Sequence, residues 1–157
     1  MATDQSKAMN LTITNTLEAH LTSIVEIENA AHSHPWSRHL LSQLDSRGAC
    51  HRVLLLDEQV IGYFYAQNIV GEVTLLNIAV SPSYQGSGYG HKLMEAFLAM
   101  CQQADAESAW LEVRESNRRA IALYESCGFN QIDVRVNYYP TENGKENAVI
   151  MTCSYFE

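Results

Sequence analysis

The sequence predicts an α/β fold with a mixed, mostly antiparallel central sheet, one parallel β-α-β crossover and helices on both faces. Strand-like runs and helical patterns follow one another in the order β-α-α-β-β-β-α-β-α-β-β. The early strands are joined by connections short enough for antiparallel hairpins. A helix-length segment separates the next two strands, which requires a parallel crossover of right-handed sense.

The N-terminal third predicts one strand and two helices. Residues 10–15 (NLTITN) alternate between apolar and polar side chains, as a strand does. Apolar residues at close to helical spacing predict a helix over residues 17–32. After Pro35, residues 37–48 predict a second, short helix that ends near Gly48.

The middle of the chain is rich in strands. Three apolar, strand-like segments follow one another there: residues 50–57, 59–70 and 72–80. Asp57 and Glu58 separate the first two segments and form a hairpin signal. The third segment ends just before Pro82, and the glycine-rich stretch follows it.

The C-terminal half predicts two helices and three strands. The helices are expected over residues 90–106 and 116–129, and the strands over residues 108–114, 129–140 and 147–156. Ser116 or Asn117 is the N-cap of the second helix, and Gly128 has the usual position of a C-terminal glycine. The last two strands are joined across residues 141–146, where Asn143 and Gly144 favour a turn.

Length and composition predict one domain over residues 1–157, with residues 1–9 as a flexible extension. The chain has 157 residues, of which 46% are hydrophobic and 18% charged, enough for a substantial core. No apolar run reaches the roughly 18 residues that a membrane span needs. The first residues are polar and lack the apolar core of a signal peptide. We therefore expect a soluble, cytoplasmic protein without a membrane partner.

The formal net charge of −8 bears on the choice of partner. Asp and Glu number 18 against 10 Lys and Arg. This balance argues against direct nucleic-acid binding, which depends on cations that neutralise phosphates. It permits a basic protein or peptide as a partner, although solubility alone explains it equally well.

Cysteines and histidines give no metal signature. None of the four cysteines (Cys50, Cys101, Cys127 and Cys153) forms a C-x-x-C pair, so we expect buried thiols. Three histidines lie close together in the sequence: His32, His34 and His39. No cysteine or carboxylate cluster nearby completes a site, and we predict no metal.

The glycine-rich stretch SPSYQGSGYGHKLMEAF, residues 81–97, lies between a predicted strand and a predicted helix. Glycines allow backbone N–H groups to approach an anion closely, and a helix N-terminus favours negative charge. His91 stands where a dinucleotide fingerprint needs glycine and a nucleoside-triphosphate loop needs lysine. The remaining pattern, Q-x-x-G-x-G, is matched by Gln85, Gly88 and Gly90. It resembles the pyrophosphate loop of the GNAT N-acetyltransferases, which bind acetyl-coenzyme A; a glycine-rich turn without a ligand is the alternative.

A second group of residues lies on the strand at 108–114 and the helix after it. Trp110, Glu112 and Arg114 share one face of that strand. A carboxylate in the middle of a central strand is unusual, since an isolated buried charge is penalised. A Glu112–Arg114 ion pair or an edge position explains it without function. Taken alone, Tyr124 is expected to be a core tyrosine whose hydroxyl has a hydrogen-bond partner.

Three stretches together resemble one branch of the GNAT superfamily. They are AHSHPWS, WLEVRESNRRAIALYESCGF and NYYP…NGKENAVIM. They resemble the ribosomal-protein alanine N-acetyltransferases of the RimI type, and the resemblance extends over about residues 26–151. It implies the GNAT acyltransferase fold, with acetyl-coenzyme A as co-substrate and no metal.

The resemblance also implies roles for individual residues. Glu112 matches the general base and Tyr124 the general acid. The coenzyme contacts match Ile78, Ala79, Val80, Gln85, Gly86, Ser87, Gly88, Tyr89, Gly90, His91, Asn117 and Tyr124. Candidate acceptor-lining residues are Trp36, Tyr138 and Tyr139, although packing against the sheet explains the two tyrosines as well. Ser87 is a departure, because longer basic or polar side chains are frequent there in the superfamily.

The implied reaction is direct attack of an amine on the thioester. Cys127 lies one helical turn past Tyr124, but no histidine is near it in sequence, which favours a buried thiol over a nucleophile. The implied acceptor is the N-terminal alanine of a small-subunit ribosomal protein with a basic N-terminus. Another protein N-terminus, a lysine or a small amine such as a polyamine is the alternative acceptor, and a non-catalytic acyl-coenzyme A-binding module is the alternative to an enzyme.

Overall fold

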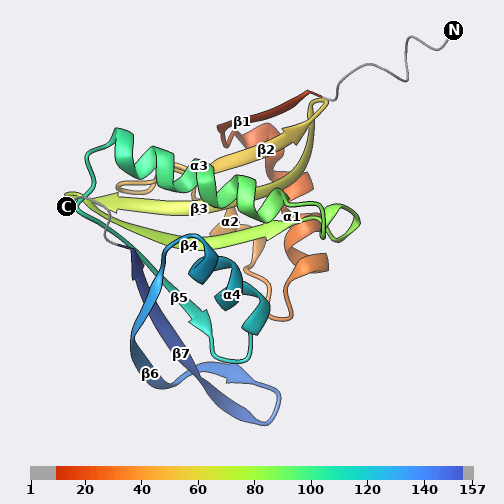
Figure 1. Cartoon of the computed structure of the whole chain (residues 1–157). Helices are drawn as coiled ribbons and strands as arrows, with labels where there is room; N and C mark the ends of the chain where they lie inside the picture. The colour runs from red at the N-terminus through yellow and green to blue at the C-terminus, as the bar shows by residue number, and fades with distance from the viewer. Residues whose placement is uncertain (1–9, 154–157) are drawn as a thin grey trace, which may run out of the picture.

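Seven strands form one mixed sheet in residues 10–153, the part of the chain that the computed structural model describes (Figure 1). Their order across the sheet is β1-β2-β3-β4-β5-β7-β6. The bounds are β1 Leu11–Asn15, β2 Arg52–Leu56, β3 Gln59–Ile69, β4 Glu72–Val80, β5 Ser108–Arg114, β6 Asn130–Thr141 and β7 Gly144–Cys153. β4 and β5 pair in parallel, and every other neighbouring pair is antiparallel. The predicted fold class and element order are confirmed.

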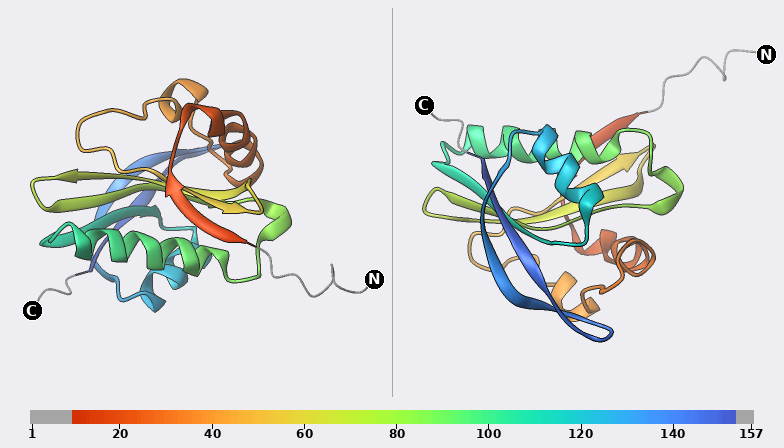
Figure 2. Two further views of the ribbon diagram at one scale, coloured as in Figure 1. Left: turned by 90° about the horizontal axis from the view of Figure 1, so that it is seen from above. Right: turned by 60° about the horizontal axis from the view of Figure 1, so that its bottom comes forward.

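Helices cover both faces of the sheet (Figure 2). α1 (Leu21–Ala31), which follows a 3-10 turn at Glu18–His20, and α2 (Arg38–Leu41) lie on one face. α3 (Tyr89–Gln103) and α4 (Arg118–Ser126) lie on the other. Each face has its own apolar core. Phe64, Phe97 and Leu111 belong to the core under α3 and α4, whereas Ile24, Leu41 and Tyr63 belong to the core under α1 and α2.

The predicted helix over residues 37–48 is wrong in length, because α2 has only four residues. Ser37 caps its N-terminus by accepting a hydrogen bond from the backbone of Leu40 at 3.2 Å. Leu41 is fully buried and anchors the turn. Beyond it the chain is mostly polar, and the carbonyl of Gln43 interacts with the His51 ring at 3.2 Å instead of continuing a helix. Without an apolar stripe a longer helix has nothing to pack.

Two tight turns build the antiparallel part of the sheet. Asp57 (φ 50°) and Glu58 (φ 72°) both have left-handed backbone, as a two-residue hairpin turn of type I′ requires, which confirms the predicted hairpin. Val70 and Gly71 form a similar turn between β3 and β4.

The last hairpin is tighter than predicted. Its turn lies at Glu142 and Asn143 rather than at Asn143 and Gly144, because Gly144 already pairs with Thr141. β7 therefore begins at Gly144 instead of residue 147. The end of the predicted strand, residues 154–156, and the predicted extension over residues 1–9 lie outside the described residues.

The parallel pair opens where the site lies. β4 and β5 are paired only as far as Leu75 and Leu111, and the two strands then diverge (Figure 1). A bulge at the same point of β4 places Leu76 opposite no residue of β3. Bulges bend a strand and increase its twist. Among the described strands, none therefore pairs with the end of β4 on its β5 side. Glu112 is the first residue of β5 beyond the pairing.

Candidate active site

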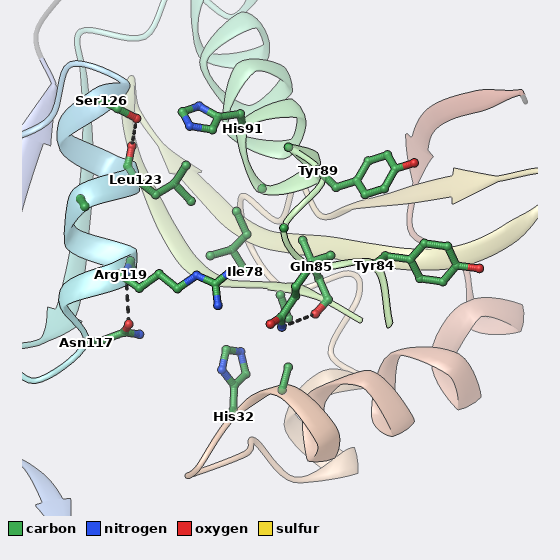
Figure 3. A pocket seen from close by; sticks show the side chains of 18 residues that line it. His32, Ile78, Tyr84, Gln85, Tyr89, His91, Asn117, Arg119, Leu123 and Ser126 are labelled. Carbon is green, nitrogen blue, oxygen red and sulfur yellow. Dashed lines mark hydrogen bonds between the residues drawn. The ribbon is translucent and has the colours of Figure 1, made fainter. Parts of the chain in front are cut away.

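A pocket of about 560 Å³ lies at the diverging end of β4. Side chains from four elements and the glycine loop surround it (Figure 3). They come from the end of α1 and the residue after it (Ala31, His32), from β4 (Ile78, Ala79, Val80), from the loop and the start of α3 (Tyr84, Gln85, Gly86, Gly88, Tyr89, Gly90, His91), and from α4 with its N-cap (Asn117, Arg119, Ala120, Ala122, Leu123, Ser126).

The three glycines of the loop, Gly86, Gly88 and Gly90, have different structural roles. Gly86 (φ 86°) and Gly88 (φ 87°) have left-handed backbone, and a Cβ atom at either would meet no protein atom within 4 Å. They are required for the shape of the chain, and the space in front of them is open to a ligand. A Cβ on Gly90 would instead meet Leu123 at 3.4 Å, so this glycine lets α3 approach α4.

Within the described part of the chain, residues 10–153, the start of α3 presents backbone donors to the pocket that lack a helical acceptor. Its first helical hydrogen bond runs from the N–H of Lys92 to the carbonyl of Gly88 at 3.1 Å. The N–H groups of Tyr89, Gly90 and His91 therefore precede the helical ladder. The positive end of the helix macrodipole adds to them, and together they suit a phosphate. Gln85 closes the loop by donating from its side-chain amide to the carbonyl of Val80 at 3.0 Å.

α4 contributes a cation that the sequence interpretation missed. Arg119 extends from the first turn of α4 toward the middle of the pocket (Figure 3). A cation in the first turn opposes the helix dipole, and this placement was the available sequence signal for a bound anion. Asn117 is the N-cap, as one of the two predicted candidates, and its side-chain oxygen accepts from the N–H of Ala120 at 3.2 Å. The pocket thus has the open glycine cradle, helix N-terminus and arginine that a pyrophosphate needs.

His32 lies on the opposite side of the pocket, and the sequence did not predict it as a coenzyme-site residue. Its Nε2 lies 3.0 Å from Oδ1 of Asn77. Asn77 in turn donates to the buried carboxylate of Glu28 at 2.9 Å, which also accepts from the hydroxyl of Tyr63 at 2.6 Å. In residues 10–153 no three His, Cys, Asp or Glu side chains are grouped to hold a metal ion.

Most predicted coenzyme residues converge on this pocket. Those that line it are Ile78, Ala79, Val80, Gln85, Gly86, Gly88, Tyr89, Gly90, His91 and Asn117. The exposed Ser87 and the buried Tyr124 do not line it. Their sequence neighbours Gly86, Gly88 and Leu123 do line it.

Glu112 pairs with an arginine that the sequence did not single out. Its Oε2 lies 2.9 Å from Nε of Arg135 on β6. The Glu112–Arg114 pair that was an alternative explanation is not formed. Arg114 instead donates to Glu146 at 3.0 Å and to the carbonyl of Pro140 at 2.8 Å. Glu112 is half-buried, with 29% of its side chain exposed.

Tyr124 lies on the other face of the sheet, in the core with Leu111 and Val113. Burial is the main reason why the pKa of Tyr124 is raised well above its ordinary value, and nearby Tyr139 and Cys127 add to the effect. Burial and then the charge of Glu112 raise the pKa of Tyr139 to about 12. Tyr139 therefore lies near both Tyr124 and Glu112.

The candidate acceptor residues separate into two groups. Tyr138 and Tyr139 lie together on β6, with ring centroids 4.9 Å apart. Trp36 packs edge-on against Tyr65 at 5.6 Å, in the core under α1 and α2. Its backbone N–H donates to Glu28 at 2.9 Å. None of the three lines the pocket.

Cys127 has a histidine beside it in space, although none is near it in the sequence. Its Sγ lies 3.9 Å from Nδ1 of His91. Burial nevertheless raises the pKa of the Cys127 thiol, which disfavours the thiolate. Cys101 and Cys153 are buried as predicted, whereas Cys50 and Cys127 are only partly buried.

Comparison with known proteins agrees with this geometry. The model of the acetyltransferase (GNAT) family matches residues 21–129. A [ribosomal protein bS18]-alanine N-acetyltransferase from Haemophilus ducreyi is 44% identical over 138 residues, which cover 86% of this chain and 94% of that protein. The protein of the same name from Escherichia coli K12 is 39% identical over 140 residues, or 89% of this chain and 95% of that protein.

A solved structure is also similar. It is the crystal structure of the ribosomal-protein-S18-alanine N-acetyltransferase from Escherichia coli, with a TM-score of 0.87 and 37% identity. The match covers 92% of this chain and 94% of that chain. The chain therefore belongs to the GNAT family of acetyltransferases and is an N-acetyltransferase that uses acetyl-coenzyme A.

Proposed function

We propose that this enzyme transfers the acetyl group of acetyl-coenzyme A to the N-terminal alanine of a small-subunit ribosomal protein. The observation that carries the proposal is the 44% identity to a [ribosomal protein bS18]-alanine N-acetyltransferase over 94% of that protein's length. A ribosomal protein is made in the cytoplasm, so the enzyme would act there. Its net charge of −8 suits an acceptor with a basic N-terminus.

The coenzyme would occupy the pocket beside β4. The N–H groups at the start of α3 and the Arg119 guanidinium would hold its pyrophosphate. The unpaired edge of β4 at Ile78–Val80 offers backbone groups to the rest of the molecule. An N–H from the same edge would polarise the thioester carbonyl.

Glu112 is the proposed general base. An α-amine has an ordinary pKa of about 7.7–8.0, so only a mild base is needed to remove its proton near neutral pH. Glu112 would take the ammonium proton directly or through one water. The neutral amine would then attack the acetyl carbon.

Tyr124 is the proposed general acid. Breaking the carbon–sulfur bond leaves a thiolate, which needs a proton. The raised pKa of Tyr124 keeps its phenol protonated over the working pH range. The reaction then needs neither a metal nor a covalent enzyme intermediate.

The test is intact-mass analysis of peptides after incubation with the enzyme and acetyl-coenzyme A. We expect one acetyl group on the α-amine of an alanine-initiated basic peptide and none on its lysines. Spermidine, an acidic alanine-initiated peptide and a basic peptide with another first residue serve as competing acceptors. Preference for spermidine or for lysine would contradict the proposal, and cofactor binding without transfer to any amine would indicate a binding module.

A further inference from the structure

The two ion pairs on the β5-β7-β6 face differ in how firmly they are held. Arg114 and Glu146 are both largely buried, with 18% and 19% of their side chains exposed. The second oxygen of Glu146 also accepts from the backbone N–H of Ser116 at 3.0 Å. In the other pair, 56% of the Arg135 side chain is exposed, and one contact joins it to Glu112. Water therefore screens and competes for the Arg135 pair much more than the Arg114 pair.

Arg135 also has a contact that does not involve Glu112. Its guanidinium carbon lies 5.2 Å from the centre of the Tyr138 ring, in cation–π contact. The register of β6 and β7 is interrupted between Arg135 and Tyr139, and Asn137 in this segment has left-handed backbone (φ 53°). This bulge brings Tyr138 next to Arg135. A guanidinium displaced from Glu112 could thus remain on the ring without returning fully to water.

We propose that Arg135 occupies the amine subsite of the free enzyme and is displaced from Glu112 by the positively charged amine of the acceptor. The proposal rests on the assignment of Glu112 as general base. An ammonium group has the charge of a guanidinium and is more compact, so it fits the same carboxylate. Arg135 is then a positioning residue that sets how strongly an acceptor must bind, and it does not touch the reacting atoms.

Displacement would also make access to the base depend on the presence of an acceptor. While Arg135 holds Oε2 of Glu112 at 2.9 Å, that oxygen is occupied and is not free to take a proton from a water. Without an acceptor, Glu112 could otherwise activate water. The water oxygen would bond to the acetyl carbon and lose its proton to Glu112. The carbon–sulfur bond would break, and the sulfur would receive a proton from Tyr124, which gives acetate and coenzyme A. Arg135 suppresses this loss of acetyl-coenzyme A.

The first experiment compares steady-state kinetics of the wild type, Arg135→Gln and Arg135→Lys with an alanine-initiated basic peptide. We expect Arg135→Gln to lower KM for the peptide about twofold to fivefold and to leave kcat unchanged. This fold-change corresponds to the free energy of one exposed ion pair. Arg135→Lys keeps the charge and should stay close to the wild type. Arg47→Gln is the charge-matched control, because Arg47 is exposed in the loop before β2. A lower kcat with unchanged or higher KM would overturn the proposal, since Arg135 would then only support Glu112.

The second experiment needs no acceptor. Thiol titration measures the coenzyme A that each variant releases from acetyl-coenzyme A in water. We expect Arg135→Gln to release it about twofold to fivefold faster than the wild type, in line with the loss of one exposed ion pair. Adding Glu112→Gln should abolish the increase, and no increase would overturn the proposal. If the wild type acetylates no peptide, the proposed acceptor is wrong, but this second measurement still decides the role of Arg135.

Discussion

The coenzyme pocket and the β5-β7-β6 face are built in different ways. The pocket loop is one stretch of chain between β4 and α3, and its donors are backbone N–H groups fixed by glycines and a helix start. The β5-β7-β6 face is made of side chains that are distant in sequence, such as Glu112 with Arg135 and Arg114 with Glu146. The first region is preorganised by local geometry, and the second depends on strand register.

This difference predicts two classes of variant. Changes in the glycine loop or at Arg119 should alter coenzyme binding and leave the chemical step intact, because this part of the pocket would hold the pyrophosphate, which does not react. Changes at Glu112 or Tyr124 should alter the chemical step and leave coenzyme binding intact. Single substitutions at Glu112, Tyr124, Gly88 and Arg119 separate the two classes, with effects that decrease in that order.

Glu112→Gln should have the largest effect. We expect kcat to fall about a hundredfold or more, the usual contribution of a general base, with the dissociation constant of coenzyme A unchanged. Steady-state kinetics and calorimetric titration measure the two quantities. Glu125→Gln, on the exposed surface of α4, removes the same charge and should keep full activity. Wild-type turnover by Glu112→Gln at pH 7 would remove Glu112 from the mechanism.

Tyr124→Phe should reduce kcat by about tenfold to a hundredfold, since it removes a general acid. The pH profile gives a second readout. For the wild type we expect kcat/KM to rise up to about pH 8 with deprotonation of the amine. The phenol must be protonated to donate, and burial raises the pKa of Tyr124 above its ordinary 10.0, so the rate should not decline up to pH 10. A decline well below pH 10 in the wild type would contradict this role.

Gly88→Ala should weaken coenzyme binding. A non-glycine residue at φ 87° is strained, and the new methyl group would project into the open space of the cradle. We expect the dissociation constant of coenzyme A to rise about tenfold, a loss of about 1.4 kcal/mol. Calorimetric titration measures it, and saturating coenzyme should restore kcat. Ser83→Ala, in the exposed turn before the loop, is the control. Unchanged affinity would mean that the loop does not hold the coenzyme.

Arg119→Gln should have the smallest effect. We expect the dissociation constant of coenzyme A to rise about threefold to fivefold at low salt, in line with a solvent-screened ion pair. The difference from the wild type should shrink as salt is added. Arg118→Gln removes the same charge one residue earlier, where the side chain is exposed and does not line the pocket, and should bind normally. Equal effects of the two substitutions would mean that Arg119 acts only through its charge and does not contact the coenzyme.

Much of the coenzyme pocket could be predicted from the sequence because the residues that form its loop are neighbours along the chain. The spacing of Gln85, Gly88 and Gly90 fixes a loop shape, and the helical pattern that follows supplies the N-terminus. Arg119 escaped prediction because helical spacing places it on α4 but does not say which neighbour that face meets. The packing of α4 against α3 decides this, and it depends on the tertiary fold.

The β5-β7-β6 face could be predicted only in outline. Alternation along β5 correctly placed Glu112 and Arg114 on one face, with Leu111 and Val113 buried on the other. It did not reveal that Arg114 would pair with Glu146, nor that Arg135 would reach Glu112. Those partners are set by the register across β7 and by the bulge before Tyr139.

The sequence by itself determined the order of the elements, the hairpin at Asp57 and Glu58, and the glycine loop, since backbone preferences and apolar periodicity act over a few residues. Only the tertiary structure decided which charges meet, how β4 and β5 diverge beyond Leu75 and Leu111, and that His91 lies beside Cys127. These depend on strand register and helix packing, which bring together residues that no local pattern connects.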